Sequence, residues 1–335
     1  MVTELERRIR RRLDSLTKPQ GSLGRLEELA LQVGLIQATD MPSVGRKAML
    51  LFCADHGVVE EGVSPFPQEV TRQMVANFRA GGAAITVLCR QYGIEPVIVD
   101  MGVGKPTRNF AREPAMSRAE AEQAIEAGRA HATDGDLLGA GEMGIGNSTT
   151  AAALLCAFTG IDPREAAGRG TGLDDAGVTR KADVIAGALA LHRTGHLDAI
   201  GILAALGGFE IAAIVGLILG AAQKRRVVVL DGFISCSAAL VVRALEPAAL
   251  DCVVYSHRSA ERGHRKMLES LNAQPLFDLD MRLGEGTGAA IGISLIEAAV
   301  RLYREMATFE SAAVSTGPDS TDVVTPPASR SGAAP

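Results

Sequence analysis

Five short apolar runs alternate with longer alanine-rich stretches along the middle of the chain. The runs end at glycine or polar residues and cover residues 48–54, 96–100, 199–206, 227–230 and 251–257. Helical stretches lie between them at residues 68–91, 117–131, 147–158, 178–194, 235–245 and 259–272. Continuous apolar strands alternating with helices predict an α/β fold with a mostly parallel sheet and helices on both faces. We therefore expect functional residues in the loops at the carboxyl ends of the strands.

Residues 2–40 carry the pattern of two helices. Leu5, Ile9 and Leu13 form an apolar stripe, and after a Pro/Gly break the helical pattern resumes over residues 23–36. Arginines cover most of the remaining surface of the first helix. Such a run is typical of a solvated helix face rather than of a nucleic-acid patch.

The stretch over residues 200–222 is almost wholly apolar and long enough to span a bilayer. A Gly-Gly pair and Glu210 interrupt it. A strand over about 199–206, a glycine turn and a buried helix over about 209–222 therefore explain it better than a membrane span.

Composition narrows the function classes. The chain has 335 residues, 47% of them hydrophobic, and a formal net charge of −5. It can bury one large core with a smaller attachment. Without a basic excess, and with 4% aromatic residues and no Trp, it lacks the charge and the rings that nucleic-acid binding uses. We expect neither a nucleic-acid nor a membrane partner.

The cysteines are scattered, odd in number and mostly within apolar runs, without a C-x-x-C pair. This pattern predicts buried, reduced thiols in a cytoplasmic protein. The N-terminal segment, with acidic residues and no apolar signal core, agrees with that location. The cysteines are Cys53, Cys89, Cys156, Cys236 and Cys252.

Two glycine-rich segments carry candidate chemistry. Gly141-Glu-Met-Gly-Ile-Gly-Asn-Ser-Thr-Thr150 opens a helix, whose first N–H groups and hydroxyls suit an anion such as a phosphate. The segment matches neither a Walker motif nor a full G-x-G-x-x-G, so a plain tight turn is the alternative. Gly168-Arg-Gly-Thr-Gly-Leu-Asp-Asp175, followed by Lys181, supplies a second loop and a cation for the same charge.

Glu285 stands between two glycines in a loop that leads into an apolar helix. A carboxylate held there can act as a general base. The alternative is a charge that stabilises the helix N-terminus. Glu142 and Glu210 also lie beside glycines, so spacing alone does not choose among the three.

Polar residues at the strand ends offer a weaker metal hypothesis. Asp55, His56, Asp100 and His257 are possible ligands, but no H-x-x-x-H or H-E-x-x-H spacing supports them. Loop or cap roles are the alternative. No G-x-S-x-G elbow and no paired Cys/His signature is present, so covalent catalysis has no candidate.

Taken together, these motifs resemble the nicotinate-nucleotide–dimethylbenzimidazole phosphoribosyltransferase family. Each motif alone is weak, but their order is highly specific, and they run from about residue 16 to 306. The motifs are Thr17-Lys-Pro-Gln-Gly-Ser-Leu-Gly-Arg-Leu-Glu, Ala54-Asp-His-Gly-Val, Gly62-Val-Ser-Pro-Phe-Pro-Gln-Glu-Val-Thr, Gly141-Glu-Met-Gly-Ile-Gly-Asn, Gly170-Thr-Gly-Leu-Asp-Asp, Leu206-Gly-Gly-Phe-Glu, Leu230-Asp-Gly-Phe, Ser256-His-Arg-Ser and Leu283-Gly-Glu-Gly-Thr-Gly.

The resemblance implies a reaction in cobalamin lower-ligand synthesis. Nicotinate mononucleotide and 5,6-dimethylbenzimidazole would give nicotinate and α-ribazole 5′-phosphate, with inversion at C1′. Glu285 matches the family's general base. Nicotinate leaves as a neutral ring, so the resemblance implies no metal and no cofactor. The work falls to positioning and electrostatics.

The resemblance also implies a set of binding residues. The acceptor pocket would lie around residues 64–67, with Gln73 and Leu283 near the base. The nucleotide and its phosphate would be bound at Glu142, Gly144, Gly146, Asn147, Gly172, Lys181, Asp231, Gly232 and Ser259.

Family resemblance further implies a homodimer with a Rossmann-like large domain and a small helical domain built from both chain ends. We expect residues 1–40 and 289–310 to form the small domain and residues 41–288 the large one. Residues 311–335, rich in Ser, Thr, Pro, Ala and Gly, are predicted to be a disordered tail.

Three other functions stay open from the sequence. One is the same transfer to a purine or phenol. The second is a metal-dependent nucleotide hydrolase built on Asp55, His56 and Asp100, which a chelator would inactivate. The third is a non-catalytic nucleotide-binding module, whose function would survive Glu285→Gln.

Overall fold

The computed structural model describes residues 2–170 and 172–315 and contains a five-stranded parallel sheet. The strand order is β2-β1-β3-β4-β5, so the chain crosses over repeatedly through helices. This confirms the predicted α/β class with a mostly parallel sheet. The strands are β1 (Lys47–Cys53), β2 (Glu95–Asp100), β3 (Leu137–Met143), β4 (Val227–Leu230) and β5 (Val253–Tyr255).

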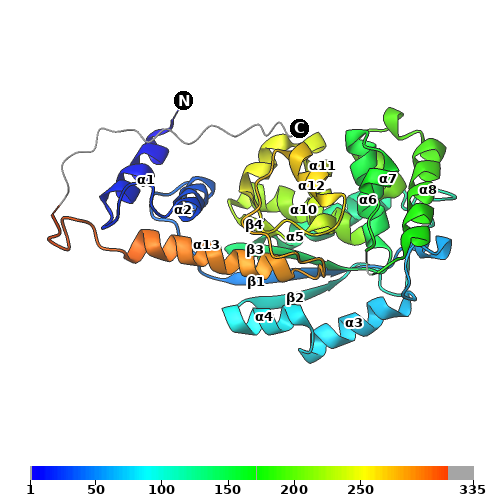
Figure 1. The fold of residues 1–335 in the computed structure, drawn as a ribbon, viewed down its shortest axis with the longest axis horizontal. Helices are drawn as coiled ribbons and strands as arrows, with labels where there is room; N and C mark the ends of the chain where they lie inside the picture. The colour runs from blue at the N-terminus through cyan, green and yellow to red at the C-terminus, as the bar shows by residue number, and fades with distance from the viewer. Residues whose placement is uncertain (1, 171, 316–335) are drawn as a thin grey trace, which may run out of the picture.

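Helices cover both faces of the sheet (Figure 1). Leu50 and Phe52 of β1 pack into one core with the helices of one face, while Met49 and Leu51 pack into a second core on the other. Successive side chains along a strand point to opposite faces of the sheet, so each strand contributes to two apolar layers. The first face carries α5 (Arg118–Ala130), α6 (Asn147–Thr159), α10 (Phe209–Lys224) and α11 (Phe233–Leu245); the second carries α3 (Glu69–Ala80), α4 (Ala84–Tyr92) and α13 (Thr287–Glu305).

The strand predicted over 199–206 is wrong, because this segment forms helix α9 (Ala199–Leu206). The carboxylate of Asp198 accepts a hydrogen bond from the backbone N–H of Gly201 at 2.8 Å and caps the helix. A short apolar run fits a buried helix as well as a strand, and here the N-cap decides.

The missing strand is β3, which lies between β1 and β4 and which the sequence pattern presented as a glycine-rich loop. Its glycines serve close packing. A Cβ at Gly139 would lie 2.8 Å from Sδ of Met49, and one at Gly141 would lie 2.8 Å from the backbone nitrogen of Gly286. The small residues in this strand therefore allow neighbouring segments of the chain to pack closely against its backbone.

Several helix boundaries also differ from the prediction. The stretch over 68–91 is two helices, because Gly81 adopts a left-handed φ of 77° and ends α3. The stretch over 259–272 becomes helical only at α12 (His264–Leu271). The other elements of the central part of the chain are α7 (Pro163–Ala166), α8 (Asp175–His192), and the 3₁₀ segments η1 (Gly57–Glu61), η2 (His131–Thr133), η3 (Thr194–His196) and η4 (Pro247–Cys252).

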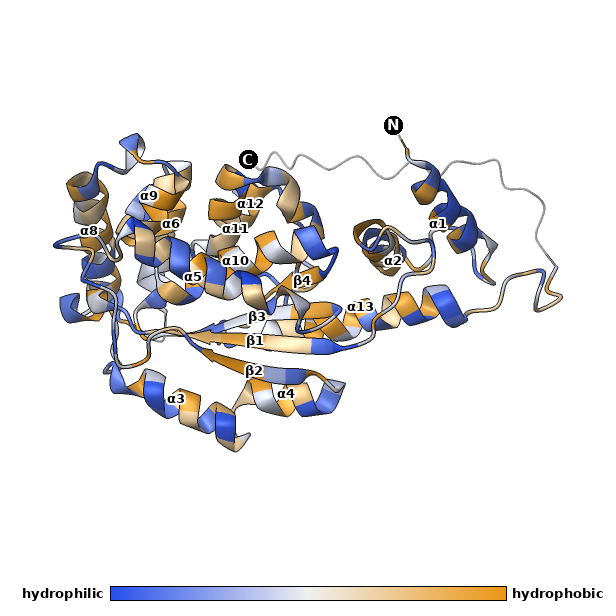
Figure 2. Cartoon of the chain, turned by 180° about the vertical axis from the view of Figure 1, so that it is seen from behind, coloured by the Kyte–Doolittle hydropathy of each residue, from blue (hydrophilic) through white to orange (hydrophobic). Residues whose placement is uncertain are grey.

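The chain ends meet in a separate apolar cluster. It joins α1 (Glu4–Ser15) and α2 (Arg25–Ile36) to the end of α13 through Ile9, Leu31 and Tyr303, among others. Figure 2 shows α1 as predominantly hydrophilic, in agreement with its arginine-covered face. This cluster agrees with a small unit built from both ends, and the domain boundaries themselves stay a prediction.

Two further expectations concern the described residues. The five cysteines are buried and unpaired. Among residues 2–170 and 172–315, none of the helices combines the length and the apolar character that a membrane span needs. Of the predicted tail, residues 316–335 lie outside the described part, and Val314 closes a hydrogen-bonded turn on Phe309.

Candidate active site

A cavity of about 290 Å³ opens at the carboxyl end of β3. One part of its wall is polar and the other is apolar, and loops from several elements contribute to both. The lining residues are Val63, Ser64, Phe66, Val70, Met74, Glu142, Met143, Gly144, Ile145, Gly146, Asn147, Ser148, Gly170, Ile234, Glu261, Arg282, Leu283 and Glu285. The cavity therefore unites the two glycine-rich segments with the Glu285 loop.

Glu142 reaches the cavity from the end of β3 and is almost completely buried. Its carboxyl group accepts a hydrogen bond from the side-chain amide of Asn147. Burial, together with the negative charges of Asp231 and Glu210, raises the pKa of Glu142 to about 8. Glu142 is therefore a carboxyl group that can hold a proton at neutral pH.

Glu285 lines the same cavity from a loop with an unusual backbone conformation. Its φ is +62°, and its neighbours Gly284 and Gly286 have φ values of +81° and +84°. A non-glycine residue with positive φ costs about 1 kcal/mol or more and is held there by its surroundings. Burial, with a contribution from the charge of Asp231, raises the pKa of Glu285 to about 7.

Asp231 fixes the start of α13 and with it the Glu285 loop. From the end of β4 its buried carboxylate accepts backbone hydrogen bonds from Gly286 at 3.0 Å, Gly288 at 2.6 Å and Ala289 at 3.1 Å. An acceptor at a helix N-terminus satisfies N–H groups that the helix leaves free. Asp231 thus stands behind the cavity wall and positions Glu285.

A buried cation lies under the two glycine-rich loops. The ammonium group of Lys181 on α8 donates hydrogen bonds to Oγ of Ser148 at 3.0 Å and to the carbonyl of Gly168 at 3.2 Å. Burial lowers the pKa of Lys181 to about 8. Gly170 lines the cavity beside this group, and Asn147 begins α6 there. A cation, a hydroxyl and a helix N-terminus together suit a phosphate.

The apolar part of the cavity lies near its mouth. Phe66 and Leu283 are exposed large hydrophobic residues, with 46% and 56% of their surfaces accessible. Val70 and Met74 of α3 continue this wall into the interior. An apolar slot with few polar groups suits a flat aromatic ligand.

Comparisons with known proteins identify the family of the chain. A family described as phosphoribosyltransferase matches residues 1–314. The nicotinate-nucleotide–dimethylbenzimidazole phosphoribosyltransferases of Chloroflexus aggregans and of Roseiflexus sp. strain RS-1 are each 49% identical to the chain; each match covers 91% of this chain and 92% of the relative. The chain belongs to this family. The resemblance carried by the ordered motifs is thereby confirmed.

A solved structure of the family has the same fold. The crystal structure of CobT from Thermus thermophilus superposes with a TM-score of 0.89 at 42% sequence identity. The match covers 94% of this chain and 100% of that chain. The α/β fold of this phosphoribosyltransferase is therefore shared along almost its whole length.

The cavity brings together six of the twelve site residues that the sequence indicated. Glu142, Gly144, Gly146, Asn147, Leu283 and Glu285 line the cavity, as do Ser64 and Phe66 of the expected acceptor segment. Sequence reasoning missed Arg282 and Glu261, although each lies within two residues of a quoted motif. Arg282 donates a hydrogen bond to the carbonyl of Gly170 at 3.4 Å, and burial raises the pKa of Glu261.

The other six predicted residues lie outside the lining: Lys181 and Asp231, described above, and Gln73, Gly172, Gly232 and Ser259. Gln73 is on the exposed side of α3, and Gly172 has a left-handed φ of +128° with open space around it. Gly232 packs against His257, and Oγ of Ser259 accepts a hydrogen bond from the backbone N–H of Glu261 at 3.3 Å. Gly232 and Ser259 therefore shape the loops behind the cavity.

The residues considered as metal ligands have other contacts. A carboxylate oxygen of Asp55 accepts a hydrogen bond from the N–H of Gly104 at 2.7 Å, and Asp100 accepts from Gly102 and Val103, each at 2.9 Å. These are the loop roles named as the alternative. Within the described part of the chain, no three His, Cys, Asp or Glu side chains gather in a way that could hold a metal ion.

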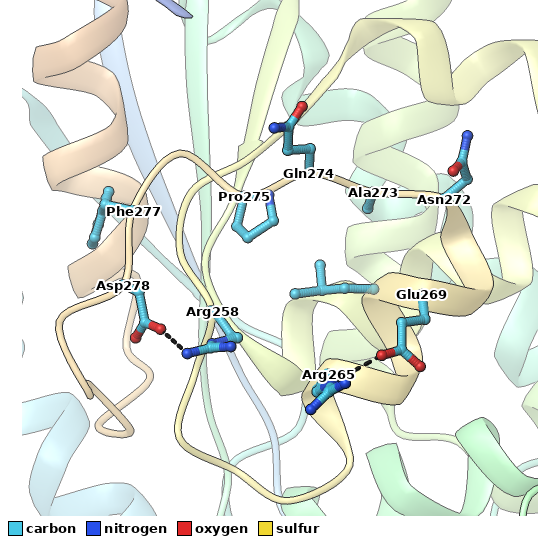
Figure 3. Close-up of a pocket in the computed structure, with 10 residues that line it drawn as sticks. Arg258, Arg265, Glu269, Asn272, Ala273, Gln274, Pro275, Phe277 and Asp278 are labelled. Atoms are coloured by element: carbon cyan, nitrogen blue, oxygen red, sulfur yellow. Dashed lines mark hydrogen bonds and ion pairs between the residues drawn. The ribbon is translucent and has the colours of Figure 1, made fainter. Parts of the chain in front are cut away.

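A larger hollow of about 940 Å³ lies between α12 and the segment that follows it (Figure 3). Its side chains pair with one another, since Arg258 binds Asp278 and Arg265 binds Glu269. None of the predicted binding residues lines it. The smaller cavity is therefore the candidate active site.

Proposed function

We propose that the enzyme transfers the 5-phosphoribosyl group of nicotinate mononucleotide to 5,6-dimethylbenzimidazole, giving nicotinate and α-ribazole 5′-phosphate in cobalamin lower-ligand synthesis. The observation that carries this proposal is Glu285, a buried carboxyl group with a pKa of about 7 that lines an apolar slot beside an anion-binding loop. A general base is most effective when its pKa lies near the working pH.

In the proposed reaction, Glu285 removes the proton from the benzimidazole N–H. The other ring nitrogen attacks C1′ from the face opposite nicotinate, so a β nucleotide becomes an α nucleotide. Nicotinate departs as a neutral ring, because the bond electrons return to its pyridinium nitrogen. The enzyme contributes orientation of the two rings and a negative environment for the positive charge on the reacting sugar and ring.

The environment favours Glu285 over the two other glutamates that flank glycines. Glu210 does not line the cavity and is fully buried against His56. The carboxyl group of Glu142 already accepts a hydrogen bond from the side-chain amide of Asn147. A carboxyl group that is engaged in this way is less available to take a proton from a substrate.

We assign the nucleotide to the polar part of the cavity. Glu142, Gly144, Gly146 and Asn147 would line the nucleotide, while Lys181 and Ser148 would meet its phosphate. The hydrogen bond between Lys181 and Ser148, and the N-terminus of α6 beside them, support this assignment. Gly172, Asp231, Gly232 and Ser259 would act from the loops around this part.

The acceptor base would occupy the apolar part, between Phe66 and Leu283 and close to α3 with Gln73. A purine or a phenol is the alternative acceptor. An apolar slot with few polar groups selects a ligand by its size more strictly than by its hydrogen-bonding groups. A panel of bases decides between these acceptors.

The proposal is tested by incubating the purified protein with nicotinate mononucleotide and 5,6-dimethylbenzimidazole in the presence of EDTA. We expect stoichiometric nicotinate and α-ribazole 5′-phosphate by chromatography with mass detection. Nicotinate release without a ribosylated base would refute the transfer to this acceptor. Activity that requires a metal and disappears with EDTA would support the nucleotide hydrolase instead.

We further propose that the enzyme is a homodimer in the cytoplasm. Five buried, unpaired thiols support a reducing compartment. Exposed Phe66 and Leu283 at the cavity mouth support a partner surface there. Sedimentation analysis tests the dimer, and Leu283→Glu, which places a charge on this surface, should shift the protein toward the monomer.

A further inference from the structure

A buried histidine and a buried glutamate lie directly behind the polar wall of the cavity. Nε2 of His56 and Oε1 of Glu210 are 2.7 Å apart, and the two side chains are 1% and 0% exposed. A carboxylate only accepts hydrogen bonds, so Nε2 carries the proton of this bond. Nδ1 of the same ring is 3.1 Å from the hydroxyl oxygen of Thr150.

Three glycines from two motifs make room for this pair. A Cβ at Gly144 would lie 3.0 Å from Nε2 of His56, and one at Gly146 would lie 3.3 Å from Cβ of His56. A Cβ at Gly208 would lie 2.6 Å from Oε2 of Glu210. Any larger residue at these positions would displace the pair, so the glycines serve the interior as well as the cavity.

The pair lies against the loop that connects β3 to α6 and lines the cavity. Gly144 and Gly146 line the cavity on one side and contact His56 on the other. Thr150 stands in the first turn of α6, whose first residue, Asn147, donates a hydrogen bond to Glu142. A shift of the histidine ring would therefore displace both the loop and the hydrogen-bond partner of Glu142.

The charge of the pair also acts on the cavity. One oxygen of Glu210 has no hydrogen-bond partner among the described residues, and it is completely buried. Such a charge interacts strongly with other groups because little solvent screens it. The charged groups that face Glu142 are Glu210 from α10, Asp231 after β4 and Glu285 before α13.

We propose that His56 and Glu210 form a positioning pair for the proposed transfer: they hold the loop between β3 and α6 (residues 144–146) and place a negative charge behind Glu142 without touching either substrate. This inference rests on the proposed function. It unites the motifs around Asp55-His56, Gly144-Gly146 and Gly208-Glu210, to which the reaction itself assigns no common task.

The first test is Glu210→Gln, which keeps the shape of the side chain and removes its charge. We expect kcat to fall about 10- to 100-fold, the scale of a small misplacement of reacting groups. The KM for nicotinate mononucleotide should change less than about threefold, because the lining groups and Lys181 remain. The matched control is Asp134→Asn, whose carboxylate also binds a histidine, His131, at 2.7 Å but lies outside the cavity lining.

The second test is a titration of ¹³C-labelled glutamate side chains by NMR, with Glu142→Gln identifying the Glu142 signal. Loss of the negative charge in Glu210→Gln should lower the pKa of Glu142, while Asp134→Asn should leave it unchanged. His56→Gln, which still offers an N–H to Glu210, should retain more of kcat than His56→Leu.

Two results would overturn the proposal. One is an unchanged kcat in Glu210→Gln. The other is a loss of activity that follows only the loss of folded protein, with the Glu142 titration unaltered and no advantage of His56→Gln over His56→Leu. If the unaltered enzyme converts neither substrate, the proposed function fails. The titration of Glu142 still tests the pair in that case. An unchanged pKa of Glu142 in Glu210→Gln would refute the pair, and a lowered pKa would support it.

Discussion

The missing side chain of Gly284 makes room for the carboxyl group of Glu142. A Cβ at position 284 would lie 2.6 Å from Oε1 of Glu142, and the backbone there has a φ of +81°. The glycine before Glu285 therefore allows the two cavity carboxyl groups to approach each other. Gly284→Ala should combine a steric clash with backbone strain of about 1 kcal/mol or more.

For Gly284→Ala we expect a lower melting temperature and a loss of most activity, measured by calorimetry and by the product assay. The matched control is Gly187→Ala, an exposed helical position of α8 with open space around it. There alanine should leave activity unchanged and add up to about 1 kcal/mol of stability. A Gly284→Ala enzyme with unchanged activity and stability would contradict the close approach of the Glu142 carboxyl group to position 284.

Removal of the base is predicted to act on the rate. Glu285→Gln keeps the shape of the side chain and should lower kcat about 10²- to 10⁴-fold, the usual contribution of a general base, with little change in nucleotide affinity. Steady-state kinetics with both substrates measures this. Glu126→Gln, at an exposed carboxylate that pairs with Arg129, serves as the control. A Glu285→Gln enzyme within a few-fold of the unaltered one would remove Glu285 from the role.

The pKa of Glu285 predicts the pH dependence of the rate. Because the base must be ionised and burial raises its pKa to about 7, kcat/KM should fall as the pH drops below that value. The limiting slope is roughly tenfold per pH unit. A profile that stays flat down to about pH 5 would contradict this assignment.

Buried Glu142 should cost the enzyme stability at high pH. Its pKa is raised from 4.5 to about 8, so the folded state keeps a proton that the unfolded chain releases above pH 4.5. Stability is therefore lost as the pH rises through this window, on the order of 5 kcal/mol at its upper end. Glu142→Gln should raise the melting temperature more at about pH 9 than at about pH 5. Equal effects at both pH values would count against a buried, titrating carboxyl group.

Lys181 should act on nucleotide binding. Lys181→Ala removes a buried cation and its hydrogen bond to Ser148, and it should weaken nicotinate mononucleotide binding about 10- to 100-fold. Since burial lowers its pKa to about 8, affinity in the unaltered enzyme should fall above that pH. Calorimetric titration measures both, with exposed Lys224→Ala as the control. Unchanged affinity in Lys181→Ala would refute the phosphate assignment.

Local sequence patterns predicted many helices correctly, because amphipathic spacing and N-caps act within a few residues. They failed at the central strand. Leu137–Met143 contains two glycines and a glutamate, which are unusual in a strand and favour a loop reading. The strand forms because Met49, Gly286 and their neighbours pack against those small residues.

The sequence by itself determined the fold class, the family and the identity of Glu285 as a candidate base, because ordered motifs and alternating apolar runs are properties of the chain. Only the tertiary structure decided which of the glycine-flanked glutamates faces the cavity. Glu285 and Glu142 line it, whereas Glu210 is turned against His56 behind it. The reason is physical: burial, neighbouring charge and hydrogen-bond partners come from segments far apart in the sequence, and these set both position and pKa.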